Sequence, residues 1–296
     1  MVDLGGRRLH LSTAGSGRPV VVLEAGIASS SVSWSLVEKS IAQFTTVASY
    51  DRAGLGWSDA AEPCGTALEA AEDLARLLDC AELPGPFVLV GHSFGALIVR
   101  IFQQRWPERV AGLVLVDPMV RSEWRQPDEQ KRRMLARGVL LSRRGALLAR
   151  LGVVRFALML LAAGSHAIPK LLARASAGSG ATVTDRLVGE VRKMPRELWP
   201  AIAAHWSKPR SFRTMAAYLE NLPRSVDQLD ESRSLGNLPL RVLSAAKVVP
   251  EHAREVGLST AADHIVVRGA GHWLQLDAPS AVVQAVVSVL TEVRTG

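Results

Sequence analysis

The chain has 296 residues, of which 48% are hydrophobic and 21% charged, so composition excludes a disordered or collagen-like protein. This length favours one large domain with an inserted subdomain. The two cysteines, Cys64 and Cys80, are too few for a disulfide framework and lie in no cluster of metal ligands. Residues 1–17 lack the order of a signal peptide. We therefore expect a cytoplasmic protein without a metal site.

The net charge of +7 is concentrated in one part of the chain. Between Pro118 and Leu235, 21 Lys and Arg stand against 10 Asp and Glu, which gives this segment +11 and leaves the remainder at −4. No motif of aromatic and basic residues accompanies this excess, so we expect no nucleic-acid partner. The most apolar stretch, Val139 to Ala163, is interrupted by arginines and is a poor membrane span.

Taken in chain order, short apolar runs alternate with helical patterns at both ends of the chain. Continuously apolar strands are typical of a parallel sheet that is covered on both faces. The pattern predicts strands at 19–23, 45–50, 86–90, 110–116, 240–244 and 264–267, helices at 66–83, 94–106 and 279–293, and an antiparallel edge strand at 9–13.

The middle of the chain breaks this alternation. Residues 119–235 contain helical stretches rich in apolar residues and arginine, without the short apolar runs of the flanks. We interpret this segment as a helical cap over the carboxyl edge of the sheet. The core then consists of residues 1–118 and 236–296.

The segment 87–97 reads FVLVGHSFGAL, an apolar strand followed by G-x-S-x-G and the start of an apolar helix. In so sharp a turn, only glycine at positions 91 and 95 lets neighbouring backbone approach. The turn presents the Ser93 hydroxyl at a helix N-terminus, where unpaired N–H groups favour developing negative charge. We predict that Ser93 is a nucleophile; the alternative is a serine in an ordinary turn.

A serine hydroxyl is a poor nucleophile unless a base removes its proton. Residues 263–273 read DHIVVRGAGHW, an apolar strand followed by a glycine-rich turn that carries His272. His92 adjoins the serine, but in a tight turn we expect it to point the other way. His272 is therefore the predicted general base, against the alternative of a structural histidine.

With these motifs the chain resembles the α/β-hydrolase family, in particular its serine esterases and lipases, over about residues 9–117 and 239–293. Residues 91–95 (GHSFG) look like the family's nucleophile elbow, and residues 269–272 (GAGH) look like its catalytic-histidine turn. Residues 50–58 (YDRAGLGWS) resemble a loop with a mainly structural role. The resemblance implies an α/β fold, a mostly parallel central sheet with a helical cap inserted after the sixth strand.

The resemblance also implies an oxyanion hole made of two backbone N–H groups. The Phe94 N–H, directly after the nucleophile, is the first. The second comes from the loop after the family's third strand, where members commonly carry His-Gly. This chain has Ala25-Gly26 instead, so Ile27 is the expected donor, and the change leaves a main-chain role intact.

Two carboxylates remain candidates for the acid that orients the histidine. Asp117 follows the strand at 110–116, and an Asp at the carboxyl end of a strand faces the crevice where open α/β sheets place their sites. Glu251 is the carboxylate nearest to the position that many relatives use. The alternatives are a loop-capping role for Asp117 and a solvated charge for Glu251.

The expected reaction is acyl transfer from a carboxylic ester to water, without metal or organic cofactor. Other hydrolysis of acyl or C–C bonds, aminopeptidase activity or cofactor-free perhydrolysis would use the same triad, and a receptor that binds without turnover could retain it. A serine nucleophile argues against the haloalkane dehalogenases and epoxide hydrolases of this fold, which employ an Asp.

The composition of the cap fits an apolar, small-molecule ester or acyl substrate. Its arginines fit either an anionic substrate or peripheral contact with an anionic membrane. A lid packed on the core with solvated arginines would explain the same residues. The sequence does not set the oligomeric state.

Overall fold

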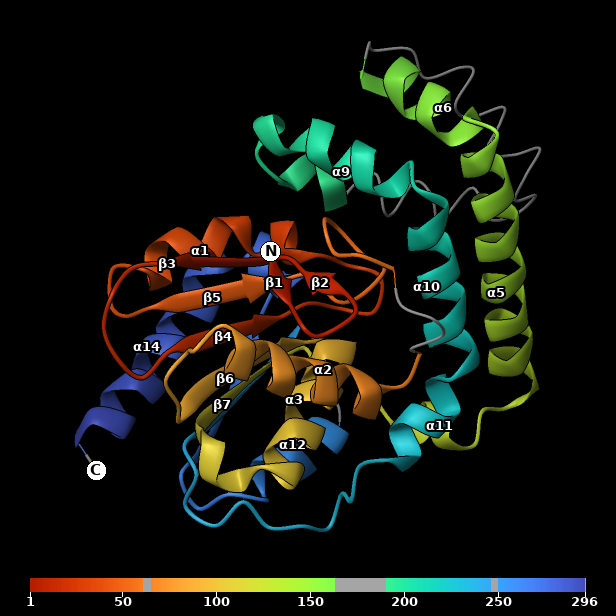
Figure 1. The fold of residues 1–296 in the computed structure, drawn as a ribbon. Helices are drawn as coiled ribbons and strands as arrows, with labels where there is room; N and C mark the ends of the chain where they lie inside the picture. The colour runs from red at the N-terminus through yellow and green to blue at the C-terminus, as the bar shows by residue number, and fades with distance from the viewer. Residues whose placement is uncertain (61–64, 163–189, 246–249, 296) are drawn as a thin grey trace.

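The computed structural model describes residues 1–60, 65–162, 190–245 and 250–295. Within these residues, seven strands form the main sheet in the order β3-β5-β4-β6-β7-β8-β9, and every neighbouring pair in it is parallel except β3 with β5 (Figure 1). The predicted, mostly parallel sheet is confirmed. Its strands are β3 (Leu11–Ala14), β4 (Val21–Glu24), β5 (Val47–Tyr50), β6 (Phe87–His92), β7 (Val110–Val116), β8 (Leu240–Ala245) and β9 (Ala262–Val267).

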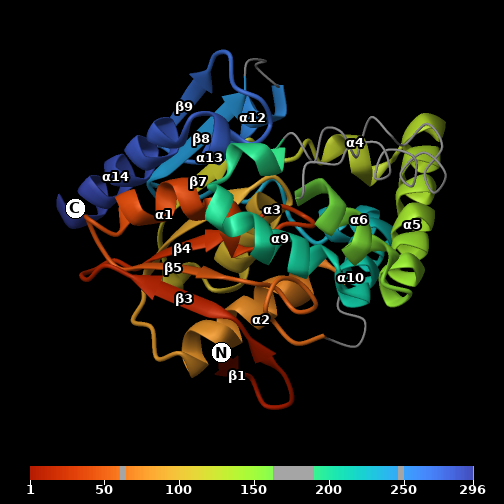
Figure 2. The same cartoon turned by 90° about the horizontal axis from the view of Figure 1, so that it is seen from above.

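Helices cover both faces of the sheet. Alternate residues of a strand point to opposite faces. In β4, Val22 packs into the core beneath α2 (Ala67–Cys80) and α3 (Phe94–Arg105), whereas Val21 packs with α1 (Ser35–Ile41) and α14 (Pro279–Thr295). Figure 2 shows α1 and α14 on one side of the strands and α2 on the other. This double cover explains why the strands are apolar without a break.

Local signals set the start of α2. The Thr66 side chain accepts a hydrogen bond from the Glu69 N–H, and the Glu69 carboxylate accepts one from the Thr66 N–H. Such a capping box satisfies two N–H groups at a helix start. The predicted helix over 66–83 therefore begins as expected, and it ends three residues early, at Cys80.

The edge of the sheet differs slightly from the prediction. An antiparallel edge strand exists, but it occupies Leu11–Ala14, beside β5. Residues Arg8–Leu9 form β2, which pairs with β1 (Val2–Asp3) in a separate ribbon. Leu9 is fully buried in the core beside β1, and the chain changes pairing partner between Leu9 and Leu11.

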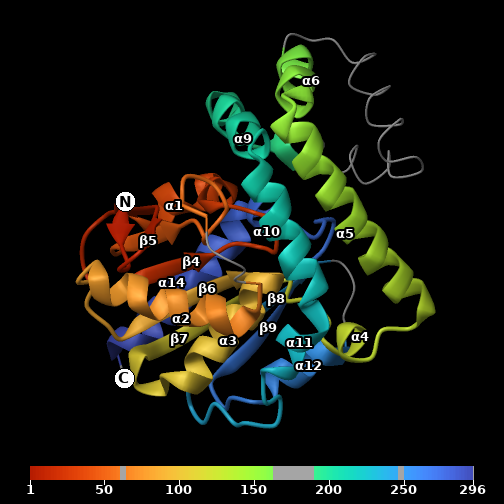
Figure 3. The ribbon, with the colours of Figure 1, turned by 45° about the vertical axis from the view of Figure 1, so that its right-hand side comes forward.

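Between β7 and β8 the described residues are mainly helical. Helices α5 and α10 run side by side on the outside of the molecule (Figure 3), and a Cβ on Gly145 would lie 2.5 Å from the Phe212 ring. The α-helices among the described residues of this insertion are α4 (Ser122–Arg125), α5 (Glu129–Arg150), α6 (Val153–Ala162), α9 (Trp199–Trp206), α10 (Pro209–Glu220) and α11 (Leu222–Asp227). The exact division into core and cap stays a prediction.

Two further helices flank the last strand. These are α12 (Pro250–Val256), before β9, and α13 (Leu274–Asp277), after it. Among the described residues, no helix combines the length and the apolar character needed to cross a membrane.

Candidate active site

Ser93 lies in the turn between β6 and α3, at the carboxyl edge of the sheet. Its φ of 54° and ψ of −115° are values that residues with side chains rarely adopt. A Cβ on Gly91 would lie 2.6 Å from the Gly95 carbonyl oxygen, and a Cβ on Gly95 would lie 2.4 Å from that of Glu24. Backbone contact therefore requires glycine at both positions, and the half-buried serine is held in the sharp turn between them.

The structure brings Ser93, His272 and Asp117 into one hydrogen-bonded line. His272 Nε2 lies 2.9 Å from Ser93 Oγ, and His272 Nδ1 lies 2.6 Å from Asp117 Oδ2. A carboxylate only accepts, so Nδ1 carries the proton and Nε2 is free to accept the serine proton. Ser93, Asp117 and His272 come after β6, β7 and β9 respectively. They meet because the carboxyl ends of parallel strands lie at the same edge of a sheet.

The turn at Asp117 is unusual in both its backbone and its ionisation. Its φ of 41° places a residue other than glycine in the left-handed region. The Asp117 N–H donates to the Leu243 carbonyl at 2.8 Å, and Oδ1 accepts from the Ala245 N–H at 2.9 Å. Burial raises the pKa of Asp117, but the hydrogen bonds from His272 and Ala245 outweigh it and hold the pKa below its ordinary value.

Glu251, the alternative acid, is engaged elsewhere. Its Oε1 accepts from the Arg121 N–H at 2.5 Å, and its Oε2 accepts from the Ser122 hydroxyl at 2.7 Å. Within the described part of the chain it makes no contact with His272. The structure therefore brings Asp117, and not Glu251, to the imidazole.

The two expected oxyanion donors flank Ser93. Phe94 is the first residue of α3, and the loop that carries Ile27 passes close to the serine, since a Cβ on Gly26 would lie 3.8 Å from Ser93 Cβ. Neither the Phe94 N–H nor the Ile27 N–H is hydrogen-bonded to any described residue. Both N–H groups are thus available to a ligand at Ser93.

Arg52 fixes that loop, a role that the sequence motif did not reveal. Its Nη1 donates to the Ala25 carbonyl at 2.7 Å, and its Nη2 donates to the carbonyls of Gly26 and Ile27. Because a trans peptide points its N–H opposite to its carbonyl, the Gly26 contact turns the Ile27 N–H away from Arg52. The guanidinium is buried and paired with Glu24 at 2.5 Å.

His92 lies directly behind the imidazole of His272. Its Nε2 donates to the His272 carbonyl at 2.8 Å, and the two ring centroids lie 4.8 Å apart. Burial, together with the neighbouring His272, lowers the pKa of His92 to about 3. His92 is therefore a neutral support of the His272 main chain at any ordinary pH.

Apolar side chains surround this edge of the sheet. Met194 and Ile202 from the insertion pack with Leu276 and with Trp273, the neighbour of His272. On the other side, the Phe94 ring meets Tyr218 of α10 edge-on, with centroids 5.2 Å apart. The insertion thus contacts the residue after Ser93 and the residue after His272.

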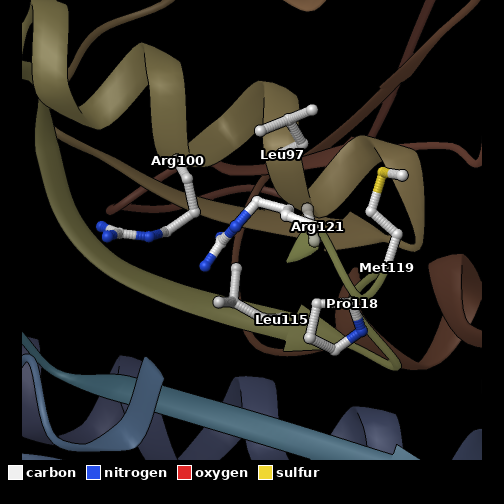
Figure 4. Close-up of a pocket in the computed structure, with 7 residues that line it drawn as sticks. Leu97, Arg100, Leu115, Pro118, Met119 and Arg121 are labelled. Carbon is white, nitrogen blue, oxygen red and sulfur yellow. The ribbon is translucent and has the colours of Figure 1, made fainter. Parts of the chain in front are cut away.

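A small hollow lies on the inner side of α3. Figure 4 shows Leu97 and Arg100 of α3 on one side of it, Pro118 and Met119 of the segment after β7 on the other, and the Arg121 side chain extending toward Arg100. It is too narrow to hold a water molecule. We therefore regard it as a packing gap and not as a substrate site.

No group of three or more His, Cys, Asp or Glu side chains in the described ranges lies where it could hold a metal ion. At this edge the Ser93, His272 and Asp117 side chains form a continuous hydrogen-bonded line. Such a line can activate a hydroxyl by proton transfer.

The fold and this site define an α/β hydrolase. The model of the alpha/beta hydrolase family matches residues 20–285, so the chain belongs to that family. It confirms the predicted fold class, with its sheet of the α/β-hydrolase type and its helical insertion.

Similar proteins include several hydrolases. The chain is 34% identical over 125 residues to 2-(acetamidomethylene)succinate hydrolase of Mesorhizobium japonicum, covering 41% of this chain and 44% of that one. It is 35% identical over 120 residues to an AB hydrolase superfamily protein of Gibberella zeae, covering 38% and 37%. The chain matches less than half of the length of these curated relatives.

A solved structure matches over nearly the whole chain. The thermophilic esterase from Thermogutta terrifontis has a TM-score of 0.65 and 22% sequence identity, covering 97% of this chain and 94% of that one. At this identity the likeness shows the fold alone.

Proposed function

We propose that the chain is a serine hydrolase that cleaves a carboxylic ester through an acyl-enzyme intermediate. Ser93 attacks the ester carbonyl while His272 takes its proton, and Asp117 keeps the imidazole in the required tautomer and stabilises its charged form. The Phe94 and Ile27 N–H groups bind the oxyanion. His272 returns the proton to the leaving alcohol. Water then attacks the acyl-enzyme carbonyl while His272 takes its proton, and that proton passes to Ser93 Oγ as the acid is released.

The observation that carries this proposal is the pair of hydrogen bonds at His272, 2.6 Å to Asp117 and 2.9 Å to Ser93. Nδ1 donates to the carboxylate and Nε2 faces the serine hydroxyl as an acceptor, which is the arrangement that proton transfer from Ser93 requires. Half of the His272 side chain is exposed, so a substrate can reach it. Apolar neighbours such as Trp273 and Ile202 favour an apolar acyl group.

The first test is labelling of Ser93 by a fluorophosphonate, followed by turnover of p-nitrophenyl esters of graded acyl length. We expect labelling and turnover that Ser93→Ala abolishes. Ser33→Ala, at a buried serine outside the triad, is the control and retains both. Labelling without ester turnover would favour the other acyl, peptide or C–C substrates, whereas the absence of both would favour a receptor.

A specific surface supports contact with an anionic membrane as a second part of the proposal. At the end of α5 and on α6, exposed apolar side chains alternate with arginines that form no ion pair with any described residue. This α5–α6 surface consists of Arg144, Leu147, Arg150, Leu151, Arg155, Phe156 and Met159. Apolar groups flanked by arginine suit the boundary between anionic headgroups and acyl chains.

Sedimentation with phosphatidylserine vesicles at low salt tests this contact. We expect wild type to sediment with these vesicles but not with phosphatidylcholine, and the double change Leu147→Ser and Leu151→Ser to abolish binding. Met134→Ser, at an exposed residue near the start of α5, is the matched control. Wild-type protein that stays in the supernatant would rule out the membrane contact.

Cellular location and domain division belong to the proposal as well. With two cysteines in the chain, and Cys80 exposed as a free thiol, we propose a cytoplasmic protein. We also propose that residues 119–235 act as one cap unit. Limited proteolysis should cut within this segment while the remaining fragments stay associated.

A further inference from the structure

The last three residues of β8 all take part in hydrogen bonds that lead to the turn carrying Asp117. The Leu243 carbonyl accepts from the Asp117 N–H, and the Ala245 N–H donates to Asp117 Oδ1. Ser244, between them, begins a separate chain of hydrogen bonds. That chain reaches the same turn through His252 of α12.

The distances define this chain. Ser244 Oγ lies 2.7 Å from His252 Nδ1 and 2.8 Å from His264 Nε2, while His252 Nε2 lies 2.7 Å from the carbonyl oxygen of Pro118. Pro118 directly follows Asp117. His252 is 2% exposed and Ser244 fully buried, whereas His264 on β9 is half-buried.

Donor chemistry gives the chain a direction. A carbonyl only accepts, so His252 Nε2 must carry a proton, and in the neutral ring Nδ1 is then an acceptor. The Ser244 hydroxyl therefore donates its proton to His252. Because the hydroxyl proton of Ser244 is donated to His252, Ser244 Oγ can only accept from His264, whose Nε2 therefore carries its proton. Every donor in the chain then has an acceptor.

We propose that His252 is a positioning residue for Asp117, held in one tautomer and one orientation by Ser244 and His264. The inference rests on the proposed function, since it gives Asp117 its catalytic partner. His252 touches no reacting atom. Its ring N–H donates to the Pro118 carbonyl, while the Leu243 carbonyl of β8 accepts from the N–H of Asp117 itself.

The backbone at Asp117 explains why such a hold is needed. With φ at 41°, the residue occupies a conformation that persists only where its surroundings impose it. The neighbouring Glu251 adds a grip on the same segment by accepting from the N–H groups of Arg121 and Ser122. The first turn of α12 thus holds the chain from Pro118 to Ser122.

Three variants test the role of His252. His252→Phe keeps an aromatic ring but removes the donor, and we expect kcat to fall about 10- to 100-fold with KM unchanged, the loss that a shift of about 1 Å in a positioned group produces. His252→Gln should restore most of kcat, because its amide N–H can reach the Pro118 carbonyl. Ser244→Ala keeps the His252 donor but removes the hydrogen bond that orients its ring, so its kcat should lie between those of His252→Phe and His252→Gln.

Thr45→Val is the matched control. The buried Thr45 hydroxyl donates to the Pro19 carbonyl at 2.6 Å, so this change also removes a side-chain donor to a proline carbonyl, but at the opposite edge of the sheet. We expect it to lower stability and leave kcat unchanged. An equal loss of kcat in Thr45→Val and His252→Phe would reduce His252 to a structural role and overturn the proposal.

A measurement that needs no turnover separates this inference from the proposed function. The proton between His272 Nδ1 and Asp117 should give a low-field NMR resonance that His252→Phe displaces and His252→Gln retains. If the wild type is neither labelled by the fluorophosphonate nor active on esters, the proposed function is refuted. The resonance still tests whether His252 positions Asp117. An unchanged resonance in His252→Phe would overturn that role.

Discussion

His92 makes a sharp prediction about stability and pH. Burial and the adjacent His272 lower its pKa from 6.5 to about 3. In the unfolded chain the imidazole takes up a proton as the pH falls below 6.5, whereas in the folded chain it stays neutral until about pH 3. The unfolded state then binds more protons, so this contribution destabilises the fold progressively as the pH falls between these two values.

The size of the effect follows from the two pKa values. Between pH 7 and pH 5 the protonation of unfolded His92 costs the folded state about 2 kcal/mol, since each unit of pKa difference corresponds to about 1.4 kcal/mol. Because His92 is 1% exposed, water does not solvate the ring in the folded protein and so does not reduce this cost. A loss of this size is a large part of the stability of an ordinary domain.

Urea unfolding at pH 7 and pH 5, for wild type and His92→Gln, measures it. The Gln side chain can still donate to the His272 carbonyl but does not titrate. Its loss of unfolding free energy between the two pH values should be about 2 kcal/mol smaller than that of wild type. His205, whose pKa is also lowered by burial, to about 4, contributes to both proteins and cancels. Equal losses in the two proteins would refute the reasoning.

Three further changes have defined outcomes. Asp117→Asn should lower kcat by about 10³-fold or more, because the amide favours the wrong imidazole tautomer; steady-state kinetics at the wild-type rate would contradict it. Gly95→Ala places a Cβ 2.4 Å from the Glu24 carbonyl oxygen and should cost about 1–3 kcal/mol in urea unfolding and lower kcat. Arg52→Met removes the ionic partner of the buried Glu24 and should cost about 3–5 kcal/mol in urea unfolding; the double change with Glu24→Leu should recover much of this, and an additive double change would disprove the pairing.

The sequence was informative where signals are local. The apolar runs predicted the sheet, and the elbow and the glycine-rich turn pointed to Ser93 and His272, since each motif lies within a few consecutive residues. Which carboxylate reaches His272 could not be predicted from local motifs, because it depends on the order of the strands in the sheet. Asp117 reaches His272 because β7, β8 and β9 are neighbours, while Glu251 reaches the N–H groups of the segment after β7.

Supporting residues could not be read from the sequence. Arg52 lies in a motif that we regarded as mainly structural, and its grip on the carbonyls of Ala25, Gly26 and Ile27 exists only once two loops meet. The expectation that His92 points away from the serine left out its hydrogen bond to the His272 carbonyl. Contacts between distant segments carry no local pattern.

The anchoring of Asp117 on β8 has a consequence for how this chain can diversify. The acid is secured by groups from β8 on one side and α12 on the other, although the long insertion starts only a few residues later. A recombinant that exchanges residues 129–220 for helices of another sequence would therefore leave the acid in register with its histidine. The contacts that hold Asp117 in place thus lie outside the segment that would be exchanged.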